Sequence, residues 1–190
     1  YISSNGFISF DPFAGSGCCT GQLLPNPFNP NDLIALSWED FYPPLGGTIG
    51  YFTTGVAPFR RLVVEYNGIG HFSSGINPIT GQIILNETYN TVELHITSFS
   101  TDGDLFAGET QGIENATGTV GTAVPGRNST DPWPGQPITN DAWIFTPIVP
   151  YSFVWTPNTW LSTDTVYNPI LTPLSTGNFT YTVTVTDILS

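Results

Sequence analysis

The stretch QIILNETYNTVELHI, residues 82 to 96, determines the fold class. From Thr91 to Thr97, apolar residues alternate with polar ones, which is the period-two pattern of a strand that buries one face. The run Gln82-Ile83-Ile84-Leu85 precedes this strand, and a short polar connection at 86 to 90 joins the two. The stretch therefore predicts an antiparallel hairpin.

Further strands are expected before this hairpin. Residues 48 to 53 and 61 to 66 are rich in β-forming residues and are bounded by Gly or Pro. Helical periodicity is nearly absent, and 20 Gly and 17 Pro interrupt any long helix. We therefore predict an all-β chain that folds as an antiparallel β-sandwich.

A second segment is expected after the stiff linker Pro147-Ile148-Val149-Pro150. At 151 to 155, three aromatic residues alternate with Ser152 and Val154. Residues 179 to 186 alternate aromatic residues or Val with Thr, which is the strongest strand signal in the chain. An immunoglobulin-like sandwich needs roughly seven strands in about 100 residues. The segment is therefore either an incomplete β module or one that leans on the first domain.

Composition limits the possible functions. The 190 residues carry a net charge of -12, with no lysine, whereas nucleic acids and anionic membranes bind clustered positive charge. No run approaches the roughly 18 apolar residues of a membrane-spanning helix. We therefore expect neither a nucleic-acid partner nor direct membrane insertion. Because the chain contains no Met and begins inside an apparent strand, we interpret it as a piece of a longer polypeptide.

The chain carries six short motifs in order, at Asn5 to Phe10, Ile34 to Asp40, Gly47 to Tyr51, Arg61 to Tyr66, Gln82 to Ile96 and Gln111 to Asn115. Together they resemble the nidogen-like extracellular domain, from Tyr1 to about Pro147. That family usually has aromatic-rich strands before its Asn-Gly-Phe turn, and this chain lacks them. The resemblance therefore implies a nidogen-like sandwich at residues 1–147 without its first strands.

Other segments are similar to proteins of Bacteroidota. Cys18-Cys19 and Ala142 to Pro147 look like the form found in large surface proteins of that group. Residues 148–190, with Trp155-Thr156-Pro157 and Tyr181 to Asp187, are similar to part of a PKD-like or Ig-like repeat in gliding-motility adhesins and related type IX-secreted proteins. The resemblance implies a noncatalytic extracellular module on the cell surface, within a large adhesin or stalk protein, whose partners are other domains of the same polypeptide.

Two cysteines stand next to each other in a Gly-rich loop. Cys18 and Cys19 can form a strained vicinal disulfide, remain two reduced thiols, or bond to sequence outside the chain. A zinc site is not expected, because no Cys-x-x-Cys or His-rich spacing accompanies them.

The best candidate for a metal site is Asp102-Gly103-Asp104, where Asp102 and Asp104 flank a flexible residue and Glu109 follows. Calcium prefers such oxygen ligands, so it is the one cofactor that the sequence suggests. The alternative is an acidic, solvated turn.

No catalytic arrangement is indicated. His71 and His95 are the only histidines, and His95 lies on the polar face of its strand. Glu39 and Asp40 are adjacent strand residues that point to opposite faces, whereas a glycosidase needs two carboxyls that face one sugar. We therefore expect that the protein is not an enzyme.

Two alternative functions remain. Trp133 lies between two prolines and is the candidate for an exposed ring that stacks on surface glycans, as in a carbohydrate-binding, lectin-like domain. Trp38, Trp143 and Trp155 lie in apparent strands and are assigned to the core. The other alternative is a self-assembling surface filament, in which the strand Phe179 to Asp187 adds to the sheet of another copy.

Surface modification is also expected. Asn86, Asn115, Asn128 and Asn178 fit the N-glycosylation pattern, which a bacterial source would usually leave bare. Thr165 and its two neighbours resemble the O-glycosylation motif of Bacteroidota, so the family resemblance favours Thr165.

Overall fold

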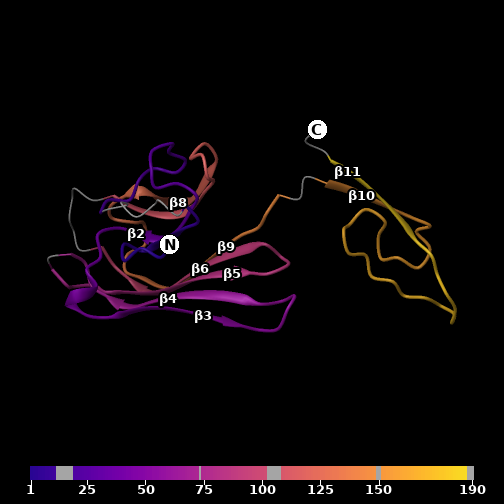
Figure 1. Ribbon diagram of the computed structural model, residues 1–190, viewed down its shortest axis with the longest axis horizontal. Coiled ribbons are helices and arrows are strands. Elements are labelled where there is room, and N and C mark those ends of the chain that lie inside the picture. Colours follow the sequence, from indigo (N-terminus) through magenta and orange to yellow (C-terminus); the bar gives the residue numbers. More distant parts are fainter. Residues whose placement is uncertain (12–18, 73, 102–107, 149–150, 188–190) are drawn as a thin grey trace. The chain divides into compact units, whose positions relative to one another are not determined.

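The computed structural model describes residues 1–11, 19–72, 74–101, 108–148 and 151–187. The chain divides into two compact units, Tyr1–Thr146 and Pro147–Ser190, one residue before the boundary suggested by the sequence. In the described part of the chain, the first unit contains two sheets and a single 3-10 turn at Pro43–Leu45, and the second contains one sheet (Figure 1). Among the residues described, no helix has the length and apolar character needed to cross a membrane.

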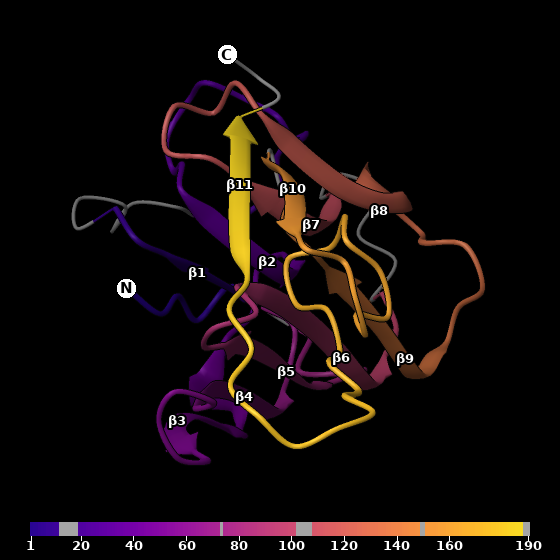
Figure 2. The ribbon, with the colours of Figure 1, turned by 90° about the vertical axis from the view of Figure 1, so that its right-hand side faces the viewer.

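The first unit is an antiparallel β-sandwich, which confirms the predicted fold class (Figures 1 and 2). One sheet has the strand order β1-β2-β7-β8, and the other has the order β3-β4-β5-β6-β9. The strands of this unit span Phe7–Ser9 (β1), Leu33–Trp38 (β2), Thr48–Thr54 (β3), Arg61–Ile69 (β4), Ile79–Asn86 (β5), Thr91–Phe99 (β6), Glu109–Glu114 (β7), Gly121–Thr130 (β8) and Ile138–Phe145 (β9).

The predicted hairpin is formed by β5 and β6. Asn86 pairs with Thr91 across the turn, and Ile83 lies opposite Leu94. Both of these apolar side chains are fully buried, because they face the sandwich interior and pack in one cluster with residues of β2 such as Leu36. The hairpin therefore supplies the centre of the core that joins the two sheets.

Strand β2 is buried on both of its faces, which explains why it reads as a nearly continuous apolar run. Ile34 and Leu36 belong to the core between the sheets. Ala35 and Trp38 pack instead in a second cluster that includes Leu24 of the preceding loop. The loop thus covers the outer face of the four-stranded sheet.

The Asn-Gly turn before β1 requires its glycine. Gly6 has φ = 77°, and its carbonyl oxygen accepts hydrogen bonds from the backbone of Leu36 and Ser37 at 2.9 and 3.3 Å. A Cβ atom at Gly6 would lie 2.0 Å from the Ser37 carbonyl oxygen. The motif Asn5-Gly6-Phe7 therefore sets the close approach of the turn to β2.

Arg127 links the two sheets across their margins. This buried side chain on β8 donates from Nη1 to Gln111 of β7 at 2.6 Å and to Asp141 of β9 at 2.5 Å. Its guanidinium also lies over the rings of Trp133 and Trp143, at 5.0 and 6.0 Å from their centroids. Since β8 and β9 belong to different sheets, the arginine ties one sheet to the other.

The second unit contains one antiparallel pair, β10 (Tyr151–Thr156) and β11 (Thr182–Asp187). The strand expected from Phe179 begins at Thr182 instead, because the Phe179 ring packs edge-on against Trp160 at 4.8 Å. The Trp155 indole donates to the Val166 carbonyl oxygen at 2.8 Å. These two contacts connect β10 and the segment between the strands to one another and to the residues just before β11.

Arg127→Ala is expected to lower the free energy of unfolding by about 2 kcal/mol, because it leaves the Gln111 side-chain oxygen without its donor and the partly buried Asp141 carboxylate without its charged partner. Urea denaturation measures this change. The matched control is Arg60→Ala, which removes an ion pair to Glu87 on an exposed hairpin and is expected to change stability little. Equal losses in the two variants would contradict a linking role for Arg127.

Candidate functional site

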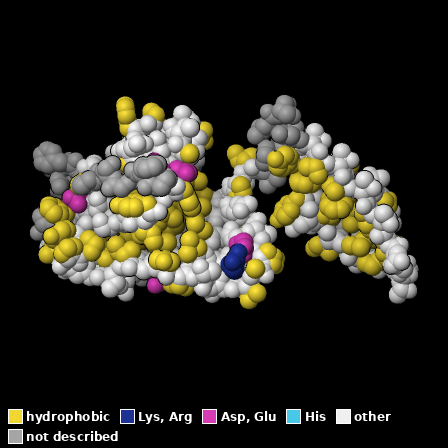
Figure 3. All heavy atoms as spheres, viewed as in Figure 1, with side chains coloured by type: hydrophobic (Ala, Val, Ile, Leu, Met, Phe, Trp, Pro, Cys, Tyr) yellow, Lys and Arg dark blue, Asp and Glu magenta, His cyan; other side chains and the backbone are white. Residues whose placement is uncertain are grey.

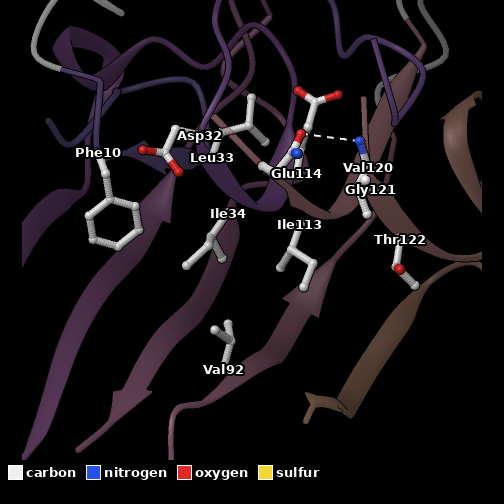
Figure 4. Close-up of a pocket in the computed structure, with 11 residues that line it drawn as sticks. Phe10, Asp32, Leu33, Ile34, Val92, Ile113, Glu114, Val120, Gly121 and Thr122 are labelled. Atoms are coloured by element: carbon white, nitrogen blue, oxygen red, sulfur yellow. Dashed lines mark hydrogen bonds between the residues drawn. The ribbon is translucent and has the colours of Figure 1, made fainter. Parts of the chain in front are cut away.

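An apolar pocket of about 320 Å³ opens where the two sheets meet at the margin of the sandwich. Ile34 of β2, Ile113 of β7 and Val92 of β6 point toward one another at its centre (Figure 4). Phe10 flanks the pocket and is 59% exposed, and Val120 is 66% exposed. The pocket therefore offers an apolar floor and exposed apolar walls to an incoming group.

Acidic residues stand beside this apolar floor. Asp32 and Glu114 both line the pocket (Figure 4). A carboxylate oxygen of Glu114 accepts a hydrogen bond from the Asn26 backbone N–H, and burial raises the pKa of Glu114 above its ordinary value. The pocket combines apolar surface with negative charge, and its lining residues include no histidine, cysteine or serine. Such a lining can bind an apolar group that carries a polar or positively charged end.

A separate polar cluster lies inside the sandwich. Glu39, His71 and Glu109 are each no more than 4% exposed. His71 Nδ1 contacts a carboxylate oxygen of Glu39, and Nε2 lies 3.1 Å from the Asn77 carbonyl oxygen and 3.0 Å from that of Ser100. Because a carbonyl oxygen only accepts hydrogen bonds, Nε2 carries a proton, and a further proton joins Nδ1 to Glu39.

Glu109 of this cluster is neutral at physiological pH. Burial first, and then the nearby charge of Glu39 and a hydrogen bond between the two carboxyls, raise the pKa of Glu109 to about 10. The charge of Asp131 acts in the same direction, and His71 opposes it. The neutral carboxyl group can therefore share its proton with Glu39, which makes the cluster a structural hydrogen-bond network rather than a solvent-facing acid–base site.

The sequence did not reveal this cluster. His71 had no role assigned, and Glu39 was considered only beside its neighbour Asp40. Glu39 and His71 are 32 residues apart, and no motif joins them. The one indication in the sequence is the residue type of Glu39. It follows an apolar strand, and a carboxyl group that is buried there needs a hydrogen-bond or charge partner.

The prediction that Trp133 presents an exposed ring is wrong. Trp133 is 1% exposed, and its ring packs against Phe99 with centroids 4.8 Å apart. Its indole Nε1 donates to the Glu109 carbonyl oxygen at 3.2 Å, and Arg127 covers the ring. The loop that carries Trp133 therefore turns the ring into the core, where both its apolar face and its N–H are satisfied.

The other singled-out aromatic and histidine residues lie as follows. Trp38 is buried, as predicted, whereas Trp143 is 38% exposed and is not a core residue. The difference arises because Trp143 lies on β9, an edge strand, where its indole donates to Asp141 at 3.0 Å. His95 is partly exposed and bonds Glu93 at 2.8 Å, which confirms its place on the polar face.

The glycosylation candidates differ in accessibility. Asn115, Asn178 and Thr165 are exposed. The amide nitrogen of Asn86 donates to Thr91 and Glu93, and that of Asn128 donates to the Leu24 carbonyl oxygen. Modification of Asn86 or Asn128 would therefore break hydrogen bonds that connect strands or hold a loop. Modification of all five positions stays a prediction.

Three predicted site residues lie outside the described part of the chain, namely Cys18, Asp102 and Asp104. The disulfide between Cys18 and Cys19 and the calcium site at Asp102 and Asp104 therefore stay predictions. Within the ranges that the structure describes, no group of three or more His, Cys, Asp and Glu side chains could hold a metal ion.

Comparison with known proteins gives one match. The family model described as NIDO related matches residues 1–157. The match covers the whole first unit and extends through β10 of the second. No curated protein and no solved structure matches the chain.

The raised pKa of Glu109 predicts an unusual dependence of stability on pH. The folded state keeps the proton up to about pH 10, whereas the unfolded chain releases it above about pH 4.5, so stability falls as the pH rises between these values. Glu109→Gln mimics the neutral carboxyl and is expected to flatten this fall. Urea denaturation between about pH 5 and about pH 9 measures the slope.

The control is Glu87→Gln. The Arg60 guanidinium lowers the pKa of Glu87 to about 2, so Glu87 is ionised in both states over the tested range. Its substitution is expected to leave the slope unchanged. A parent protein whose stability does not fall toward high pH would contradict a neutral Glu109.

Proposed function

The chain belongs to the NIDO-related family, and from this premise we propose that it is a noncatalytic extracellular module of a large cell-surface protein, which contributes to adhesion or spaces adhesive domains. The proposal includes the origin in Bacteroidota, type IX secretion and a role in gliding motility. Its partners are then other domains of the same polypeptide and the surface to which the cell attaches.

The observation that supports adhesion is that polar groups are buried inside the first unit while apolar side chains are exposed at its margin. The His71 cluster is buried, whereas the pocket at the sandwich margin exposes apolar side chains such as Phe10. Figure 3 shows few charged side chains on one face of the molecule and many hydrophobic ones on the first unit. Exposed apolar surface beside a pocket favours binding over chemistry.

The two alternatives are supported unequally. The aromatic residue proposed for a lectin-like role, Trp133, is buried, so it does not support that role. Assembly into a filament through β11 has a structural basis, because β10 is the only strand that pairs with β11 among the described residues. Val183 and Val185 of β11 are 38% and 50% exposed. We retain strand addition at β11 as the second candidate.

The adhesive role predicts that exposed apolar residues at the pocket retain the protein on surfaces. Beads coated with the chain are passed in flow over hydrophobic glass and over immobilised polysaccharide. The double variant Phe10→Ser and Val120→Ser is expected to reduce retention by about threefold or more, because it removes apolar area from the pocket walls.

The matched control is Ile148→Ser and Leu174→Ser, which removes two apolar side chains that are 86% and 84% exposed in the second unit. Retention of the control is expected to equal that of the parent. If beads coated with the parent adhere no better than beads coated with an unrelated acidic protein, adhesion by this module is rejected and the spacer role is favoured.

A further inference from the structure

A polar groove of about 300 Å³ crosses the middle of the five-stranded sheet. It is formed by β4, β5 and β6, which are neighbours in that sheet (Figure 1). Tyr66, which belongs to the core, lies beneath the groove, so the residues on either side of it in β4 point away from the core. The side chains that surround the groove are all polar, namely Glu65, Asn67, Thr80, Gln82, His95 and Thr97.

Two interruptions of the strand register shape one end of this groove. Gly68 is an extra residue in β4, because its two neighbours pair with consecutive residues of β5. It has φ = 68°, and its N–H donates to the Thr80 hydroxyl oxygen at 3.1 Å. Thr97 is likewise an extra residue in β6. Bulges of this kind redirect side chains and are common beside functional sites, so the local geometry is that of a built site.

Hydrogen bonds position the lining and leave part of it available to a ligand. Gln82 Nε2 donates to a carboxylate oxygen of Glu65 at 2.6 Å. On the same sheet Glu93 pairs with Arg61 at 3.1 Å, whereas none of the ion pairs in the described residues involves Glu65. Asn67 is exposed, and its side chain makes no hydrogen bond within the described part of the chain. The groove therefore presents a carboxylate and an amide to solvent.

The chemistry of this lining identifies a class of ligand. β4, β5 and β6 each pair with a strand on both sides, so their backbone groups are largely engaged and recognition falls to side chains. A carboxylate accepts hydrogen bonds, and amides and hydroxyls both donate and accept them, which matches the hydroxyl groups of a sugar. The net charge of -12 disfavours a polyanion. A neutral, hydroxyl-rich ligand fits these conditions.

Phe52 adds an apolar surface beside the polar groups. It is 46% exposed and lies on the same face as Gly50, which is opposite Glu65. A Cβ atom at Gly50 would meet no atom of the described residues within 4 Å, so the space beside Glu65 is open toward β3. We propose that this groove binds a neutral saccharide, whose hydroxyl groups bond Glu65, Gln82 and Asn67 and whose apolar ring face packs against Phe52. The groove gives a lectin-like role a site that does not involve Trp133.

An array of immobilised oligosaccharides tests the proposal. Neutral glycans are expected to bind the full chain, whereas sialylated and sulfated glycans are not. For the neutral glycan with the strongest signal, titration calorimetry is expected to give a dissociation constant at least about fivefold higher for Asn67→Ala and for Glu65→Gln, because each removes hydrogen bonds to the sugar. The thermal unfolding midpoints should equal that of the parent, since neither side chain is buried.

The matched controls are Asn178→Ala in the second unit and Glu87→Gln on the hairpin between β5 and β6, which make the same changes outside the groove. Both are expected to keep the parent's affinity. The proposal is overturned if no neutral glycan binds, if only anionic glycans bind, or if the groove variants bind as the controls do. Phe10→Ser with Val120→Ser is expected to bind the soluble glycan as the parent does, so this proposal and retention through the apolar pocket fail separately.

Discussion

The buried contact between His71 and Glu39 is the constraint on which the first unit depends. It joins the chain just after β2 to the connection between β4 and β5, and the second ring nitrogen holds the chain just after β6 through Ser100. The His71 ring also contacts Phe41 and Phe99, with centroids 5.1 and 6.0 Å away. A buried pair that carries a charge or shares a proton is stable only when all of its hydrogen-bond partners are in place. The segments that carry Glu39, His71 and Ser100 must therefore become ordered together.

Other polar groups of the first unit are likewise held by partners within the fold. Glu109 keeps its proton inside the sandwich, and Arg127 is held between Gln111 and Asp141 at the sheet margins. Each of these groups has hydrogen-bond or charge partners within the first unit, so it stabilises the folded state. The exposed surface carries apolar side chains such as Phe10 together with charged ones such as Arg60 and Glu87, which pair with each other there.

The sequence predicted the elements whose patterns are local. The hairpin of β5 and β6 was visible because one of its faces is buried, and the run of β2 was visible because both faces are. β8 was missed since Pro125 and Gly126 interrupt its pattern, which an edge strand tolerates and a central strand would not.

No local sequence pattern predicts the pocket, the His71 cluster or the burial of Trp133. The exposure of Trp133 was misjudged because flanking prolines indicate a loop without showing which way the loop turns its ring. The cluster around His71 depends on pairing between distant segments, and the pocket depends on how far two sheets diverge. Residue types reveal which groups need partners, whereas only the assembled sheets reveal which partners they find.

Phe10, which lies just beyond β1, lines both the pocket that contains Ile113 and a second apolar pocket of about 220 Å³, whose lining includes Leu62 and Leu85. The first pocket also carries Asp32 and Glu114, so a partner that covers it removes water from two carboxyl groups, whereas the residues described around the second pocket include no charged side chain. In a chain of net charge -12, the second pocket is therefore the opening that an apolar group enters at the lower electrostatic cost.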